Sequence, residues 1–177
     1  MSKRTDSAVD CMQYLEQRLI EQNYENCVDE QKIHDLLYLS LKEGYAIFGE
    51  PILEGSFVSQ ETGPYCVELN AMSIQRKKLF PITLRMSRQT ILVLNSILEQ
   101  YGRCSHEQLM RVICRDEAWQ SARKNSNETF FGIIDSELLR TDSRKVSVIR
   151  SLWKMDHNFY ADPSAMAIHL NWSGSAN

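Results

Sequence analysis

The chain has 177 residues, a length that suits one domain. Apolar residues make up 43% and charged residues 24%, with only 7 Gly and 4 Pro, which excludes a disordered, collagen-like or linker-rich chain. A formal net charge of -3 and a pI near 5.8 argue against a general nucleic-acid binder, which usually carries a basic footprint.

Hydropathy and charge along the chain bear on its compartment and its partner. The N-terminal MSKRTDSAVD lacks the apolar run of a signal peptide, and no stretch approaches the ~20 apolar residues of a membrane span. We therefore expect a soluble, cytoplasmic protein without a membrane partner. Residues 1–70 hold 13 acidic and 5 basic residues, whereas residues 71–177 hold 10 acidic and 15 basic. This asymmetry either steers a charged partner or vanishes when folding mixes both halves on one surface.

Two amphipathic helices are predicted in the N-terminal third. The second begins after Asp29, whose carboxylate can accept the free backbone N–H groups of the first turn. It ends at Gly49, a residue that adopts the left-handed conformation easily, and Pro51 cannot continue it. We expect this helix to be the spine of the core. Apolar residues at helical spacing are Val9, Met12, Leu15, Leu19 and Ile20 in the first helix, and Ile33, Leu36, Leu37, Leu41, Tyr45 and Phe48 in the second.

An irregular stretch, GEPILEGSFVSQETGPY, follows the second helix. Phe57 and Val58 are typical of a short extended piece. Gly63 and Pro64 predict a turn, and Pro64 suits the first turn of a helix that runs to about Lys78.

Four further helices are predicted between residues 87 and 139. One begins at Ser87 and ends at Gly102, and the next opens with an S-x-x-Q capping box. Asp116 is expected to cap a short helix that carries Trp119. The last is capped by Ser126 or Asn127. Its predicted inner side carries Phe130, Ile133, Ile134 and Leu138.

Beyond Arg140 the helical pattern fades, and residues 166–172 alternate between apolar and other types with a period of two. The predicted fold is therefore mainly α: a compact bundle of six to seven helices with short loops and room for a small β-hairpin near the C-terminus. We assign residues 1–139 to the helical domain. Residues 140–177 form a C-terminal extension that packs on it and frays at its end.

Patterns that carry catalytic or metal chemistry are missing from the sequence. There is no G-x-S-x-G elbow and no glycine-rich phosphate loop. Cys104, His106 and Cys114 are the nearest metal candidates, but their spacing fits no zinc pattern, and Cys114 is expected to pack as a small hydrophobe. His34 is expected to be partly exposed. Five cysteines without a C-x-x-C pair favour free thiols, so we predict no cofactor, no metal and no enzymatic activity.

Aromatic and basic residues gather in the last third of the chain. Aromatic side chains dominate the energetics of protein interfaces because they bury large, rigid areas, and basic side chains match an acidic partner or phosphates. The alternatives are that the aromatic residues cover the helical core and that the charges are an ordinary solvated surface. The residues predicted to bind a partner are Phe131, Arg144, Lys145, Arg150, Trp153, Tyr160 and Trp172.

Several motifs in order resemble the Panacea-domain family. QKIHDLLYL at residues 31–39 is similar to the family's signature helix, and GYAIFGEPIL and FVSQETGPYCVEL follow at 44–53 and 57–69. Further on, YGRCSHEQL at 101–109 and RDEAWQSAR at 115–123 resemble later family motifs, although Ala118 stands where the family usually has Pro. The resemblance covers residues 7–139. The matching positions that we interpret as scaffold are Leu37, Tyr38, Gly44, Tyr45, Gly49, Gly63, Pro64 and Trp119.

The resemblance implies a helical antitoxin module, SocA-like or GepA-like, that neutralises a cognate toxin by direct contact. Two variants stay open: a proteolytic adaptor that delivers the bound protein to a protease such as a Clp-type machine, and a phage or mobile-element protein that binds a host factor. A DNA-binding regulator is the weaker alternative, tested by a gel shift at ~150 mM salt because non-specific binding weakens steeply with salt.

Overall fold

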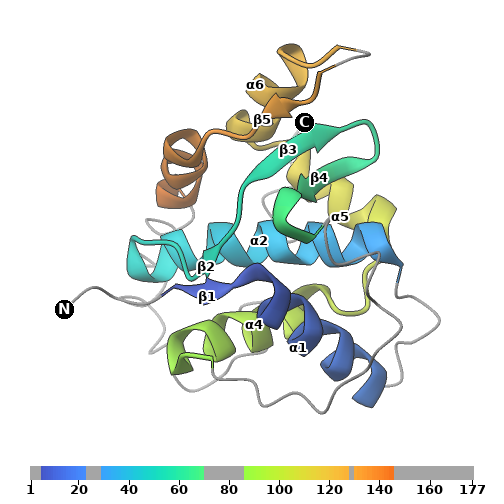
Figure 1. The fold of residues 1–177 in the computed structure, drawn as a ribbon, viewed down its shortest axis with the longest axis vertical. Coiled ribbons are helices and arrows are strands. Elements are labelled where there is room, and N and C mark those ends of the chain that lie inside the picture. Colours follow the sequence, from blue (N-terminus) through green and yellow to red (C-terminus); the bar gives the residue numbers. More distant parts are fainter. Residues whose placement is uncertain (1–4, 23–28, 70–85, 128–129, 146–177) are drawn as a thin grey trace.

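The structure, a computed structural model, describes residues 5–22, 29–69, 86–127 and 130–145. Six α-helices and two small sheets occur among these residues, which confirms a mainly α fold. Helix α2 crosses the middle of the molecule, with α1 and α4 on one side and the larger sheet, α5 and α6 on the other (Figure 1). Within the described ranges, no helix has the length and apolar character needed to cross a bilayer.

Helix α1 (Ala8–Glu21) begins where its capping residue predicts. The Ser7 hydroxyl accepts a hydrogen bond from the Val9 N–H at 3.1 Å. Four of the five apolar residues predicted for its inner face are fully or partly buried. Ile20 is the exception, because it is 52% exposed at the last turn, beyond the reach of the core.

Helix α2 (Glu30–Phe48) is the core element that its pattern predicts. Asp29 caps it by accepting the Lys32 N–H at 2.6 Å, and Gly49 ends it in the left-handed conformation at φ 72°. It contacts α1, α4, α5 and the sheet, and it is buried on nearly every side. A helix surrounded in this way is the centre of a fold, not an amphipathic surface element.

Helices α4 (Arg88–Tyr101), α5 (His106–Ile113) and α6 (Glu117–Lys124) also start at their predicted caps. Ser87 caps α4, and Ser105 forms the predicted capping box with Gln108 at the start of α5. Asp116 precedes α6 but makes no side-chain cap, because its carboxylate is bonded to residues of α2 instead.

The strands form two sheets. Strands β1 (Asp6–Ser7) and β2 (Leu53–Glu54) pair in parallel near the N-terminus. Strands β3 (Phe57–Gln60), β4 (Gly63–Cys66) and β5 (Gly132–Ile133) form an antiparallel sheet in the order β4-β3-β5. A two-residue turn joins β3 to β4, and the short 3-10 helix η2 (Val67–Leu69) follows β4.

The prediction that Pro64 begins a helix is wrong, because Pro64 lies in a strand of this sheet. Pro64 lies in β4 opposite Ser59, and the strand runs to Cys66. Proline has no N–H to donate, but an edge strand tolerates it because one side of that strand needs no ladder bonds. Pairing with β3 therefore overrides the helix-start preference of proline.

The chain between Ser126 and Asp135 also differs from its predicted helix. Gly132 and Ile133 form β5, and the Ile134 N–H donates to the Phe57 carbonyl at 2.8 Å. Helix starts only after Asp135, whose carboxylate accepts the Leu138 N–H at 2.9 Å. That helix runs through residues 136–145 and thus continues past the expected domain boundary at 139/140. The hairpin proposed for residues 166–172 lies outside the described residues.

Candidate functional site

The motif residues of α2 lie inside the fold. Leu37 and Tyr38 have no exposed surface, and the Tyr38 hydroxyl donates to the Asp116 carboxylate at 3.0 Å. Lys42 forms an ion pair with the same carboxylate. Burial raises the pKa of Asp116 and raises that of Tyr38 well above its usual value. This cluster joins α2 to the start of α6.

The other motif residues lie at points of close packing. A Cβ on Gly44 would lie 2.8 Å from the Ile52 side chain, so the chain after α2 can pass directly over the helix. Gly63 has φ 145° and is buried in β4 beside Pro64. Trp119 is 4% exposed in the core. Tyr45 is half-buried, and burial raises its pKa.

A second polar cluster links α2 to α5. The Asp35 carboxylate is fully buried and lies 2.5 Å from His106 Nδ1. Burial raises the pKa of Asp35 to about 6, against a lowering effect of His106. The Gln31 side chain donates to Asp35 at 3.3 Å and to the Pro64 carbonyl at 3.0 Å, and its carbonyl accepts from Thr62 at 3.0 Å. The cluster therefore connects both helices to the β3–β4 turn.

Two sequence predictions about polar residues are wrong. His34 is buried, with 1% exposure, because its Nδ1 accepts the Cys66 N–H at 3.1 Å and its ring stacks on Tyr65 at 4.2 Å between centroids. Cys114 is exposed, because it follows the last turn of α5.

No grouping of three potential metal ligands occurs in the part of the chain that the structure describes. His106, one of the candidates, is committed to Asp35. Burial raises the pKa of the Cys11 and Cys66 thiols to about 12, which keeps both protonated and unreactive at neutral pH.

Three of the predicted partner-binding residues lie in described parts of the chain. Phe131 is 46% exposed just before β5. Arg144 and Lys145 are exposed on the helix at 136–145, and Lys145 forms ion pairs with Asp142 at 3.3 Å and Glu117 at 3.8 Å. Phe131 and the two basic residues lie at opposite ends of α6 and do not form one cluster. The four others, Arg150, Trp153, Tyr160 and Trp172, lie outside the described residues.

The three-stranded sheet has an apolar outer face that sequence patterns alone do not reveal. Alternate residues of β3, such as Phe57 and Ser59, point inward and are buried. Val58 pairs with Tyr65 on one side and with Ile133 on the other, so these three residues form one row across the three strands. Ile133 is 67% exposed, and Val58 and Tyr65 are partly exposed. The Tyr65 ring stacks on His34 of α2, so we define the outer face as Val58, Gln60, Phe131 and Ile133.

Gly132 lets β5 approach α6 closely, because a Cβ there would lie 2.0 Å from the Ala122 carbonyl oxygen. The Ser126 hydroxyl joins the two elements: it accepts the Gly132 N–H at 2.8 Å and lies 2.7 Å from the Ser59 hydroxyl. These contacts fix the position of β5 against β3.

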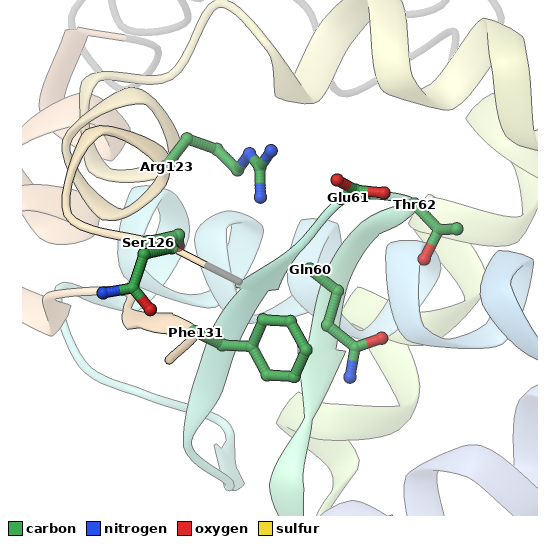
Figure 2. A pocket seen from close by; sticks show the side chains of 7 residues that line it. Gln60, Glu61, Thr62, Arg123, Ser126 and Phe131 are labelled. Atoms are coloured by element: carbon green, nitrogen blue, oxygen red, sulfur yellow. The ribbon is translucent and has the colours of Figure 1, made fainter. Parts of the chain in front are cut away.

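A hollow of about 600 Å³ opens where the β3–β5 ladder ends. The next residues in register, Gln60 and Phe131, are not paired and line it (Figure 2). The β3–β4 turn forms one wall, and the end of α6 forms the other with Arg123. Its size falls in the range of ligand-binding pockets, ~300–1,000 Å³. The outer face and this hollow together make a continuous surface with apolar, polar and charged contacts.

No family model, no curated protein and no solved structure matches this chain.

Proposed function

We propose that this chain is an antitoxin-like, non-enzymatic module of the Panacea type that acts in the cytoplasm by binding a toxin protein. We further propose that the outer face of the sheet and the adjoining hollow form its binding surface. The single observation that carries the proposal is the apolar row on the solvent side of the sheet. An antiparallel sheet with one solvated face normally carries polar residues there.

Phe131 extends this apolar surface beyond the ladder. It is 46% exposed directly before β5, and strand alternation places it on the same face as Ile133. Aromatic side chains gathered on a surface are typical of interface centres, because each buries about 150–250 Å². Contiguous exposed apolar area of this kind marks interaction sites in soluble proteins.

The polar residues of the described core support a binding role over catalysis. Asp35, Tyr38 and Asp116 each have partners within the fold, and they hold helices together. They do not converge on the hollow, and the described residues that line it include no His or Cys. The motif order across residues 7–139 supports the antitoxin assignment in particular.

Co-expression with the product of the neighbouring gene tests the proposal. We expect that gene to arrest growth alone, and this chain to restore growth and to co-purify with its product. Replacing Ile133 or Phe131 with Asp should abolish both effects, because a charge on the apolar face must be desolvated on binding.

The matched control is Leu92→Asp, since Leu92 is 56% exposed on α4, on the far side of α2 (Figure 1). A harmless neighbour that does not bind would contradict the proposal. So would an equal loss of rescue in Leu92→Asp.

A further inference from the structure

Strand β5 is an edge strand of the larger sheet. Among the described residues, the sheet order β4-β3-β5 leaves β5 with one neighbouring strand. At 67%, Ile133 is the most exposed large hydrophobic residue in the described part of the chain. Edge strands of this kind are templates for pairing with another chain, and natural proteins usually protect them with charges or proline.

The hydrogen bonds around β5 show which way its backbone points. The Ile134 N–H donates to the Phe57 carbonyl at 2.8 Å, and the Gly132 carbonyl accepts the Ser59 hydroxyl at 3.2 Å. Both residues therefore direct backbone groups towards β3. Because successive residues of a strand alternate, the N–H and C=O of Ile133 point to the opposite edge. Residue 131 lies two positions before Ile133, so the same alternation directs its backbone groups to that edge as well.

We propose that an extended segment of the partner protein adds to β5 as a fourth strand, with its apolar side chains against Phe131 and Ile133. This inference rests on the proposed function and specifies how the same surface binds. Strand addition takes affinity from main-chain hydrogen bonds and specificity from alternate side chains.

A second copy of this chain is the weaker candidate for this edge. Pairing β5 with β5 would join only two outward residues from each copy. Aromatic side chains bury about 150–250 Å² when fully covered, and these are already partly buried, so such a contact falls short of the ~1,000 Å² of a specific interface. A longer segment of another protein can continue past β5 into the hollow.

The hollow carries one basic and one acidic side chain, Arg123 on the end of α6 and Glu61 on the β3–β4 turn. Arg123 forms part of its wall, at the end of the ladder where an added strand would leave β5 (Figure 2). No ion pair of Arg123 is found among the described residues. A carboxylate on the segment would complement this guanidinium, and it would bind on the α6 side of the hollow because Glu61 on the opposite wall repels it.

A library of random linear peptides displayed on phage, panned on the full chain, tests the inference even while the toxin is unidentified. We expect the recovered peptides to alternate apolar and polar residues and to carry an Asp or Glu. Ile133→Pro should weaken their binding at least about tenfold, because proline removes the outward N–H while the bonds of Gly132 and Ile134 remain.

Two matched variants separate backbone from side-chain effects. Ile133→Ala keeps the N–H and should weaken binding less than Ile133→Pro, and the melting temperatures of both should stay within a few degrees of wild type. Arg123→Gln should weaken acidic peptides several-fold. Lys124→Gln, its exposed neighbour, should not.

Three outcomes would overturn strand addition: peptides that bind Ile133→Pro as well as wild type, peptides with helical i, i+3, i+4 spacing, or no binders. Self-association of the chain that Ile133→Pro removes would assign the edge to a second copy instead. A toxin that still binds Ile133→Pro would keep the antitoxin function and reject only this mode of binding.

Discussion

Helix α2 buries polar side chains, whereas the outer face of the sheet exposes apolar ones. In α2, the Lys32 ammonium is buried and donates to the Gly102 carbonyl at 2.8 Å, and Asp35 is buried against His106. On the outer face, Ile133 is apolar and exposed. Buried polar groups are costly unless they are hydrogen-bonded, whereas exposed apolar groups cost the isolated fold little. The difference indicates that α2 maintains the fold, and it is consistent with the proposed binding role of the outer face.

The largest effect should follow from creating a cavity beside α2. Leu37→Ala should lower the free energy of unfolding by about 2–5 kcal/mol, because Leu37 is fully buried in the core. Urea denaturation with circular dichroism measures it. Leu92→Ala, on an exposed position of α4, should change the value by less than about 0.5 kcal/mol. Equal losses in both variants would break the distinction between core and surface.

The buried Asp35 should make stability depend on pH. Its pKa of about 6 in the folded protein lies above the usual 3.8, so the folded state holds the proton more tightly. The resulting stabilisation is fully present below pH ~4 and is lost as the pH rises through about 6, an effect of roughly 3 kcal/mol. Urea unfolding from pH 4 to 8 should show wild type losing stability relative to Asp35→Asn as the pH rises.

The His106→Gln variant sharpens this test. His106 lowers the pKa of Asp35, so its removal should move the midpoint of the pH dependence upward. A stability difference between wild type and Asp35→Asn that is flat across this range would show that the carboxylate does not titrate there.

Two glycine substitutions compare the outer region with the end of α2. Gly132→Ala should destabilise by about 1–3 kcal/mol, because its Cβ would meet the Ala122 carbonyl at 2.0 Å and push β5 from α6. Gly49→Ala should cost about 1 kcal/mol, since its φ of 72° is unfavourable but its surroundings are open. Thermal denaturation ranks the two. The reverse order would contradict the close approach of β5 and α6.

The smallest effect on stability is expected on the outer face. Ile133→Ser should change the free energy of unfolding by less than about 0.5 kcal/mol and Phe131→Ser by less than about 1 kcal/mol, because Ile133 is 67% exposed and Phe131 46%. Chemical denaturation checks this. A loss above about 1 kcal/mol in either variant would mean that these side chains hold the fold together, and the comparison with α2 would fail.

Local sequence signals located most of the helices. The helix bounds depend on interactions within a few residues, such as the Asp29 cap of α2 and the Ser105–Gln108 capping box of α5, so short-range chemistry suffices to predict them. Prediction failed between Ser126 and Asp135, where apolar spacing suggested a helix. There the chain pairs with β3, which lies far away in the sequence, and such pairing leaves no local pattern.

The candidate site was predictable only in part. Phe131 was identified because aromatic residues gather in the last third of the chain. Its neighbours in the hollow, Gln60 and Arg123, come from β3 and α6, and nothing in their own sequence context points to a shared surface. The role of His34 was missed for the same reason, since its partners Tyr65 and Cys66 lie on a strand.

By itself, the sequence determined the mainly helical class, the bounds of α2 and its place in the core, because caps and apolar periodicity act over a few residues. Tertiary structure alone decided which face of the β3–β5 pair meets solvent and where the hollow opens. Register between strands distant in sequence aligns Val58 with Ile133, and a shift of one residue would turn these side chains to the other face.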